Sequence, residues 1–157
     1  MAFMLSSPAF EPNKPIPKQY SCEGRDVSPP LRWSDLPDNA KVVALICDDP
    51  DAPDPKAPRM TYVHWVLYDI PATIARLPQG GETPPGARDG RNDWKRPGYG
   101  GPCPPVGRHR YFFKLYALDA LLGDLKTPTK SQLLEAMKGH VLEQAELIGT
   151  YQKEKAS

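Results

Sequence analysis

Three apolar runs in the middle of the chain are separated by polar segments rich in acids and prolines. Residues 41–47 (KVVALIC), 62–68 (YVHWVLY) and 110–118 (RYFFKLYAL) are short and dense in β-branched or aromatic side chains. Apolar runs of this length, bounded by acids, glycines and prolines, are typical of strands covered on both faces. We therefore predict three central β-strands over these ranges.

Prolines and glycines interrupt the rest of the chain. Residues 1–36 contain six prolines, and each proline lacks an N–H and restricts the residue before it. This excludes helices and predicts an extended region with short edge strands. Residues 78–108 contain 15 prolines and glycines among 31 residues. Long excursions of this kind in a compact protein are usually functional.

A helical pattern occurs near the C-terminus. Thr129 and Gln132 have the form of a capping box, and Gly139 suits the end of a helix. Apolar residues then recur at helical spacing and predict a second short helix. The apolar faces are Leu133, Leu134 and Met137 in the first helix and Val141, Leu142, Ala145 and Ile148 in the second. The fold class predicted is mainly β with C-terminal helices, as a single domain over residues 1–157.

Composition narrows the classes of function. Twenty Lys and Arg stand against 19 Asp and Glu, a net charge of +1 that excludes the basic field needed for nucleic-acid binding. The first five residues do not resemble a secretory signal, and no apolar run is long enough for a transmembrane helix. These features predict a cytoplasmic protein. Three widely spaced cysteines, without a Cys-x-x-Cys pair, predict reduced thiols.

Polar residues able to do chemistry concentrate in three short segments beside the apolar strands. Residues 48–53 (DDPDAP) follow the first strand, His64 lies inside the second, and residues 101–111 (GPCPPVGRHRY) lead into the third. The flanking prolines and glycines hold the backbone stiffly, which lowers the entropy cost of binding.

These segments resemble the phosphatidylethanolamine-binding protein family, also described as Raf kinase inhibitor-like. That family's pocket combines an Asp-Pro-Asp-x-Pro segment, a strand histidine and a Gly-x-His-Arg segment, which correspond here to residues 49–53, His64 and residues 107–110. Further similarity to the compact bacterial and archaeal branch extends over nearly the whole chain. It includes residues 28–33 (SPPLRW), 64–68 (HWVLY) and 139–142 (GHVL).

The resemblance implies a large central antiparallel sheet, a smaller second sheet and a surface cavity for phosphate, carboxylate or phospholipid-headgroup anions. We predict neither a cofactor nor a metal, because the sequence contains no close ligand spacing. Asp51 and Arg110 would shape the cavity wall. The residues implied to contact the ligand are Asp49, His64, Pro104, Pro105, His109 and Tyr111.

Other interpretations of the same residues stay open. His64 suits a core histidine bonded to a backbone carbonyl, and acids beside prolines are often turn residues. Histidines and carboxylates together also suit a metal, although no close His pair anchors one. Cys103 suits either a reactive thiol or an incidental small residue.

Three functions follow from these observations. The first is an anion-binding module with a regulatory or inhibitory role toward a kinase or other phosphoprotein. The second is a serine protease inhibitor acting through the proline-rich loop at residues 97–108. The third is a hydrolase using His109 as general base beside Asp49. Because no nucleophile, Gly-x-Ser-x-Gly elbow or phosphate-binding loop occurs, we predict that the protein is not an enzyme.

Overall fold

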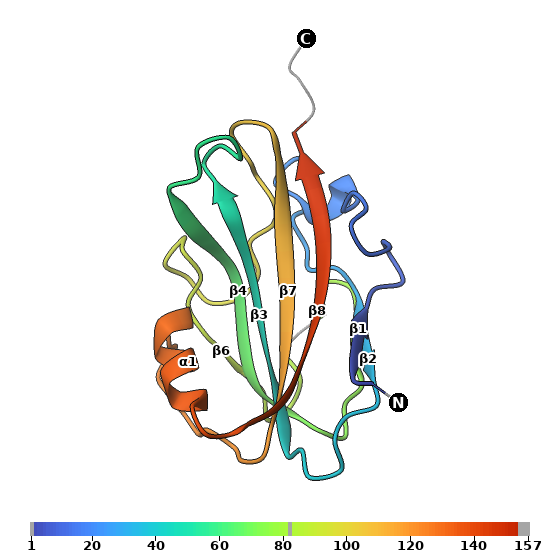
Figure 1. Ribbon diagram of the computed structural model, residues 1–157, viewed down its shortest axis with the longest axis vertical. Coiled ribbons are helices and arrows are strands. Elements are labelled where there is room, and N and C mark those ends of the chain that lie inside the picture. The colour runs from blue at the N-terminus through green and yellow to red at the C-terminus, as the bar shows by residue number, and fades with distance from the viewer. Residues whose placement is uncertain (1, 82, 154–157) are drawn as a thin grey trace.

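Two antiparallel sheets make up the protein (Figure 1). The structure is a computed structural model and describes residues 2–81 and 83–153. The larger sheet has the strand order β6-β4-β3-β7-β8 and the smaller has the order β1-β2-β5, which confirms the predicted fold class. The strands are β1 (Met4–Ser6), β2 (Leu31–Ser34), β3 (Val42–Ala52), β4 (Met60–Pro71), β5 (Arg76–Leu77), β6 (Arg88–Asp89), β7 (Arg108–Leu118) and β8 (Val141–Gln152).

All three central strands predicted from the apolar runs are present as β3, β4 and β7, and each is longer than its run. β3 continues past Cys47 through the acidic segment. Register shifts against β4 follow Cys47 and Asp49, so Pro50 lies at a bulge where no ladder partner is recorded for it. A bulge accommodates a residue that has no N–H to donate. The acids are therefore part of the strand instead of a loop that follows it.

The predicted second C-terminal helix is wrong, because this segment forms β8. β8 pairs antiparallel with β7 from Val141↔Leu118 to Gln152↔Arg108. Its buried positions are Ala145, Leu147, Gly149 and Tyr151, which alternate with period two as a strand requires. The spacing of Val141, Leu142, Ala145 and Ile148 fits a helix equally well, but pairing with β7 stabilises the segment as a strand.

The first predicted helix is confirmed as α1 (Lys130–Met137). Its capping box forms, with the Gln132 N–H donating to Thr129 Oγ1 at 3.2 Å and the Thr129 N–H donating to Gln132 Oε1 at 3.0 Å. Leu133 and Met137 are buried against the large sheet. Gly139 follows the helix with φ +82°, a conformation that suits glycine.

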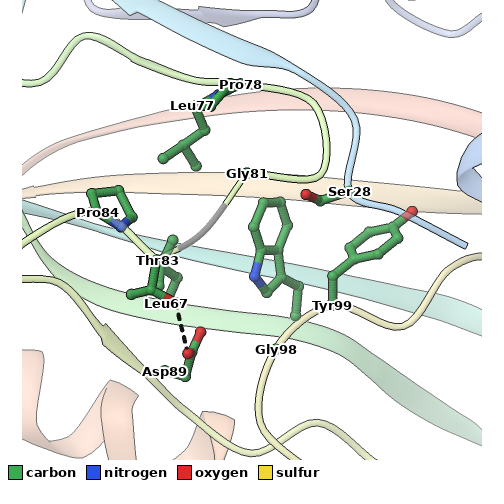
Figure 2. A pocket seen from close by; sticks show the side chains of 11 residues that line it. Ser28, Leu67, Leu77, Pro78, Gly81, Thr83, Pro84, Asp89, Gly98 and Tyr99 are labelled. Carbon is green, nitrogen blue, oxygen red and sulfur yellow. Dashed lines mark hydrogen bonds between the residues drawn. The ribbon is translucent and has the colours of Figure 1, made fainter.

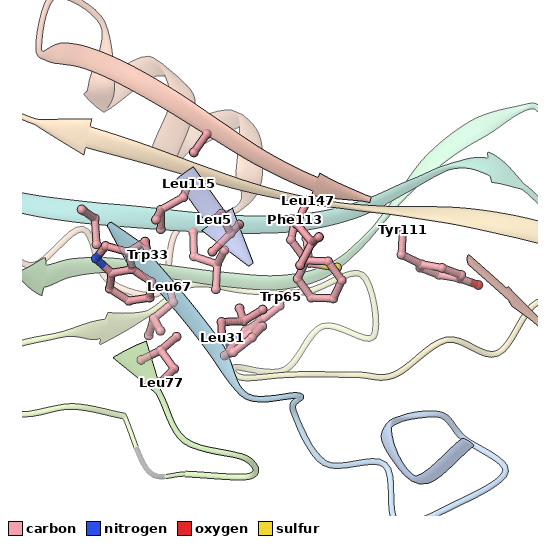
Figure 3. Close-up of a cluster of buried hydrophobic side chains, with 14 of the residues drawn as sticks. Leu5, Leu31, Trp33, Trp65, Leu67, Leu77, Tyr111, Phe113, Leu115 and Leu147 are labelled. Atoms are coloured by element: carbon pink, nitrogen blue, oxygen red, sulfur yellow. The ribbon is translucent and has the colours of Figure 1, made fainter. Parts of the chain in front are cut away.

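The large sheet is buried on both faces. Val43, Leu45 and Cys47 of β3 pack with the small sheet, in the cluster shown in Figure 3. The alternate residues of β3 pack instead with α1, in a second cluster. Burying one such aliphatic side chain stabilises the fold by about 1.5–3 kcal/mol. Successive residues of β3 therefore point into different environments, and this matters for the acids that follow.

An N-terminal strap, defined here as residues 13–16, covers one end of β8. The Asn13 and Ile16 N–H groups donate to the carbonyls of Ile148 and Thr150 at 2.6 and 2.7 Å, and the Thr150 N–H donates to the Lys14 carbonyl at 3.1 Å. After the strap, a 3₁₀ turn (Lys18–Tyr20) leads the chain to Cys22. This places the N-terminal region beside the long excursion between β4 and β7.

Candidate ligand-binding site

A cavity of about 330 Å³ lies where β3 ends and β7 begins. Its volume is at the lower end of the range for small-molecule pockets. All six residues implied by the resemblance line it, together with six others. The lining residues are Asp49, Ala52, Pro53, Met60, Tyr62, His64, Trp94, Cys103, Pro104, Pro105, His109 and Tyr111.

Strand periodicity brings the polar residues together. Asp49 of β3 stands opposite Tyr62 of β4 in the ladder, and His64 lies two residues beyond Tyr62. His109 and Tyr111 are likewise two residues apart on β7. Residues two apart on a strand share one face of the sheet. The three central strands therefore present these side chains to one side of the sheet.

Aromatic rings form much of the cavity wall. The ring centroids of Tyr62 and Trp94 are 5.0 Å apart, those of His64 and Trp94 are also 5.0 Å apart, and those of His64 and Tyr111 are 5.1 Å apart, all edge to face. Contacts of this geometry add about 0.5–1.5 kcal/mol each to the packing. Trp94 comes from the long excursion, which therefore contributes to the site as its length suggested.

His109 is fully occupied by internal hydrogen bonds. Its Nδ1 lies 2.6 Å from Asp49 Oδ2, and its Nε2 lies 2.8 Å from the Val106 carbonyl and 3.1 Å from the Pro53 carbonyl. A carbonyl oxygen can only accept, so Nε2 carries a hydrogen. The Nδ1–Oδ2 bond holds another proton between ring and carboxyl. In this arrangement neither nitrogen offers a lone pair to the cavity.

Asp49 is also satisfied within the protein. Its second oxygen, Oδ1, accepts from the Asp51 N–H at 2.8 Å, and the residue is buried. A buried carboxylate whose two oxygens both accept hydrogen bonds is held in one orientation. Asp49 and His109 together tie the bulged end of β3 to the turn before β7.

His64 is buried, and its Nδ1 has a close hydrogen-bond partner. Its Nδ1 lies 2.8 Å from the Gly100 carbonyl, so Nδ1 is the donor. Burial lowers the pKa of His64, although the Gly100 carbonyl and the charge of Asp49 act in the opposite direction. The ring is therefore neutral near pH 7, and its Nε2 is a hydrogen-bond acceptor.

Tyr111 carries an unsatisfied hydrogen-bonding group. The residue is 1% exposed, and its Oη makes no hydrogen bond of ordinary length with residues 2–81 and 83–153, although the Asp49 carboxylate is close enough to interact with it. Figure 3 shows its hydroxyl pointing away from the other labelled side chains of the cluster. Burial, followed by the negative charge of Asp49, raises the pKa of Tyr111, so the hydroxyl keeps its proton. Leaving such a group unpaired costs about 1–3 kcal/mol.

Asp51 and Arg110, expected to shape the wall, pair with each other and do not line the cavity. Asp51 Oδ2 accepts from the N–H and Nε of Arg110 at 2.9 and 3.0 Å, and Oδ1 accepts from Nη2 at 2.9 Å. The Arg110 guanidinium holds the pKa of the Asp51 carboxyl below its usual range. The pair links β3 to β7 beside the site.

The prediction of reduced thiols is wrong for two of the three cysteines. Cys22 and Cys103 form a disulfide across 81 residues of sequence, and Cys103 lines the cavity. Nothing in the cysteine spacing signals this pair. It forms because the long excursion folds back on the N-terminal region, where the Cys22 N–H donates to the Pro102 carbonyl at 3.0 Å. Cys47 is free and buried.

A second, smaller cavity of about 100 Å³ lies between the small sheet and the β4–β6 edge (Figure 2). Its acidic residue, Asp89, already accepts a hydrogen bond from Thr83 Oγ1 at 2.8 Å. Within the described residues, no group of three or more His, Cys, Asp or Glu is arranged to hold a metal. The helix described here is too short and too polar to cross a membrane.

Sequence reasoning missed several lining residues. Tyr62 could have been found, because it lies two residues before His64 on the same strand and so on the same face. Met60 follows by the same periodicity. Trp94 had no such signal, since its position depends on how the long excursion folds. The interpretation of Cys103 as an incidental residue did not anticipate its place in the wall.

Comparisons with known proteins identify the family. The family model described as phosphatidylethanolamine-binding protein matches residues 6–152, and the chain belongs to this family. A UPF0098 protein of Methanothermobacter thermautotrophicus is 47% identical over 153 residues, covering 95% of this chain and 98% of the relative. A UPF0098 protein of Chlamydia pneumoniae is 47% identical over 149 residues, covering 95% and 98%.

Two solved structures have the same fold. A homologue of phosphatidylethanolamine-binding protein from Chlamydia trachomatis superimposes with a TM-score of 0.91 at 45% identity, covering 98% of this chain and 99% of its own. YbcL of E. coli, described as a member of the mammalian family, gives a TM-score of 0.87 at 30% identity and covers 98% and 100%.

Proposed function

We propose that the protein binds a small anionic ligand in the cavity, with a phosphate, carboxylate or phospholipid-headgroup group hydrogen-bonded to Tyr111 and His64. The unpartnered, buried Tyr111 hydroxyl is the observation that carries this proposal. A buried donor without a partner is rare in a folded protein, and a ligand oxygen would satisfy it. Membership of the family supports a small-ligand function of this kind.

The two hydrogen-bonding groups suit a ligand that carries one proton. An oxygen of a phosphate monoanion would accept from Tyr111 Oη, and its P–OH would donate to Nε2 of neutral His64. A dianion would instead require His64 to become protonated, against the effect of its burial. Both routes bring one proton into the site together with the ligand. The apolar part of a larger ligand would lie against Met60 and Trp94.

Asp49 and His109 have a different role in this proposal. The resemblance implies that both contact the ligand, but their polar atoms bond to each other and to the backbone. They keep the two loops of the cavity in place. We therefore assign the direct contacts to Tyr111 and His64.

No observation favours the two alternative functions. A general base needs a lone pair directed at the substrate, and both nitrogens of His109 are engaged elsewhere. In the loop considered for protease inhibition, residues 105–108 are exposed, but Pro104 is buried and lines the cavity, so part of this loop belongs to the cavity wall. A regulatory role toward a kinase or other phosphoprotein stays within the proposal, with the partner's phosphate as the ligand.

The disulfide bears on the compartment in which the protein works. Disulfides persist in oxidising environments and are rare in the reducing cytosol. The Cys22–Cys103 pair is therefore compatible with an oxidising compartment or, at the cytoplasmic location expected from the sequence, with a disulfide that is reduced and formed again.

The test is calorimetric titration of inorganic phosphate, acetate and O-phosphoethanolamine against wild type and Tyr111→Phe. Losing one hydrogen bond to an anion should weaken binding by about 1.5–3 kcal/mol, roughly ten- to more than a hundredfold. Stability should stay unchanged or rise, because the lost hydroxyl has no partner within the fold. The matched control is Tyr116→Phe, on the same strand but outside the cavity. Equal affinity of Tyr111→Phe and wild type would contradict the proposal.

A further inference from the structure

We propose that the Cys22–Cys103 disulfide controls the cavity through its redox state. In the oxidised protein it fixes one wall of the cavity, and reduction by a dithiol frees that wall and weakens ligand binding. The inference rests on the proposed function for its binding readout, but its effect on the wall does not depend on the identity of the ligand.

The disulfide links a residue of the cavity wall to an exposed residue outside the cavity. Cys103 lines the cavity and is half-buried, whereas Cys22 lies outside the cavity and is exposed. A reductant can therefore approach the disulfide from the Cys22 side, outside the cavity. Reduction at the exposed Cys22 would therefore also release Cys103 in the cavity wall.

The chain on one side of Cys103 is held without the disulfide. The Gly100 N–H donates to the His64 carbonyl at 2.9 Å, and its own carbonyl accepts from His64 Nδ1. The Gly101 N–H donates to Asp26 Oδ1 at 2.7 Å, and the Pro102 carbonyl accepts from Cys22. Residues 100–102 should therefore keep their position after reduction.

The chain on the other side of Cys103 is held by less. Pro104 and Pro105 line the cavity, and neither has an N–H to donate. The next recorded hydrogen bond is at Val106, whose carbonyl accepts from His109 Nε2. Among the described residues, the disulfide at Cys103 is thus the tie nearest to the prolines on their N-terminal side, and the hydrogen bonds of residues 100–102 come before it. Its loss should loosen this wall more than any other part of the site.

The chemical step is thiol–disulfide exchange with a dithiol. A thiolate of the dithiol attacks the Cys22 sulfur, the sulfur–sulfur bond breaks, and the electron pair goes to Cys103, which takes up a proton. The second thiol of the reductant then displaces Cys22 and closes the reductant's own disulfide. Two electrons move from the dithiol to the protein, and Cys103 becomes a thiol in the cavity wall.

Cys47 provides an internal reference. It is free, buried in the core, and its pKa is raised, first of all by burial. A buried thiol of raised pKa is unreactive. Mild reduction and thiol labelling should therefore report on Cys22 and Cys103 and leave Cys47 unmodified in the folded protein.

The binding experiment titrates inorganic phosphate into the oxidised protein and into protein reduced with dithiothreitol. A wall that must be ordered on binding should weaken the affinity of the reduced form by about three- to tenfold. Cys22→Ser removes the disulfide without altering a lining residue. This variant should bind phosphate as weakly as the reduced form does, and dithiothreitol should not change its affinity. Cys47→Ala is the control that keeps the disulfide and should keep the redox response.

Hydrogen exchange measured by mass spectrometry is the second readout and needs no ligand. Reduction should speed exchange of the half-buried Cys103 amide, while the hydrogen-bonded amides of Gly100 and Gly101 stay protected. Unchanged exchange together with equal phosphate affinity in both forms would overturn the inference. If phosphate binds neither form but exchange changes as expected, the anion proposal fails and redox control of the wall stands.

Discussion

Asp48 and Asp49 are neighbours on β3, yet they face two regions of very different character. Asp48 points to the side of the sheet covered by α1, where its Oδ2 accepts from Lys114 at 3.3 Å and Lys130 at 2.6 Å. Asp49 points into the cavity region, where its partners are His109 and a backbone N–H. Both carboxylates are buried.

The two regions differ in whether their polar groups are all satisfied. Around Asp48, two flexible cations converge on one carboxylate and no buried side-chain polar atom there is recorded as unpartnered in the described chain. Around Asp49, rigid rings and backbone groups satisfy Asp49 and His109 but leave the Tyr111 hydroxyl without a partner. The other buried side-chain polar atom without a partner in the described chain, Trp33 Nε1, lies in the core against the small sheet, whereas Tyr111 lines the cavity, where a ligand could satisfy its hydroxyl.

The largest expected effect is on stability, from comparing Asp49→Ala with Asp48→Ala. Removing Asp49 leaves the buried His109 Nδ1 without its hydrogen-bond partner. This should lower the free energy of unfolding by about 3–5 kcal/mol. Removing Asp48 leaves two lysines that can turn to water, so the loss should be about 1–2 kcal/mol. Urea denaturation measures both. An equal loss would show that the two regions are energetically alike.

The next effect concerns the pH dependence of binding to the cavity. Phosphate esters lose their second proton near pH 6, and burial keeps His64 neutral. Affinity for O-phosphoethanolamine should therefore fall by about tenfold per pH unit between roughly pH 6.5 and 8. Calorimetry in buffers of different ionisation enthalpy counts the proton taken up. Binding that is constant across this range would show that His64 and the ligand share no proton.

The smallest effect is expected at the pair beside the site. Arg110 lowers the pKa of Asp51, so the pair stabilises the fold above the unfolded pKa of Asp, near 3.9, and this stability is lost as pH falls through the lower folded pKa. Because the Arg110 side chain is 55% exposed, Arg110→Met should cost about 1 kcal/mol or less at pH 7. The difference from wild type should disappear in strong acid, as thermal unfolding at several pH values would reveal. A difference that persists there would mean that packing of Arg110 matters more than its charge.

Much of the fold follows from local patterns. The β-branched and aromatic runs that became β3, β4 and β7 are packed on both faces by α1 and the small sheet. The helix at Lys130–Met137 follows from its capping residues. β8 could not be predicted from its local pattern. The alternation of Ala145, Leu147 and Tyr151 fits a strand, but other apolar residues of the segment fit a helix, and only the pairing with β7 distinguishes the two structures.

The candidate site, too, could be predicted from the sequence only in part. The resemblance placed His64, His109 and Tyr111 in one cavity, and strand periodicity accounts for His109 and Tyr111 sharing one face of β7. The internal bonds of His109 could not be anticipated, since they depend on the Pro53 and Val106 carbonyls, which belong to loops. The position of Trp94 and the Cys22–Cys103 bond depend on tertiary contacts of the long excursion, for which the local sequence carries no periodic signal.

The N-terminal strap also bears on how the protein behaves at high concentration. β8 is an edge strand, and an open edge can pair with an edge of another molecule and start aggregation. The strap occupies the end of β8 near Ile148 and Thr150, and exposed Glu143 and Glu146 place like charges along the remainder. Two copies approaching edge to edge would meet backbone that is already bonded at one end and mutual repulsion at the other. The strap thus disfavours edge-to-edge pairing of β8 between two copies of the protein.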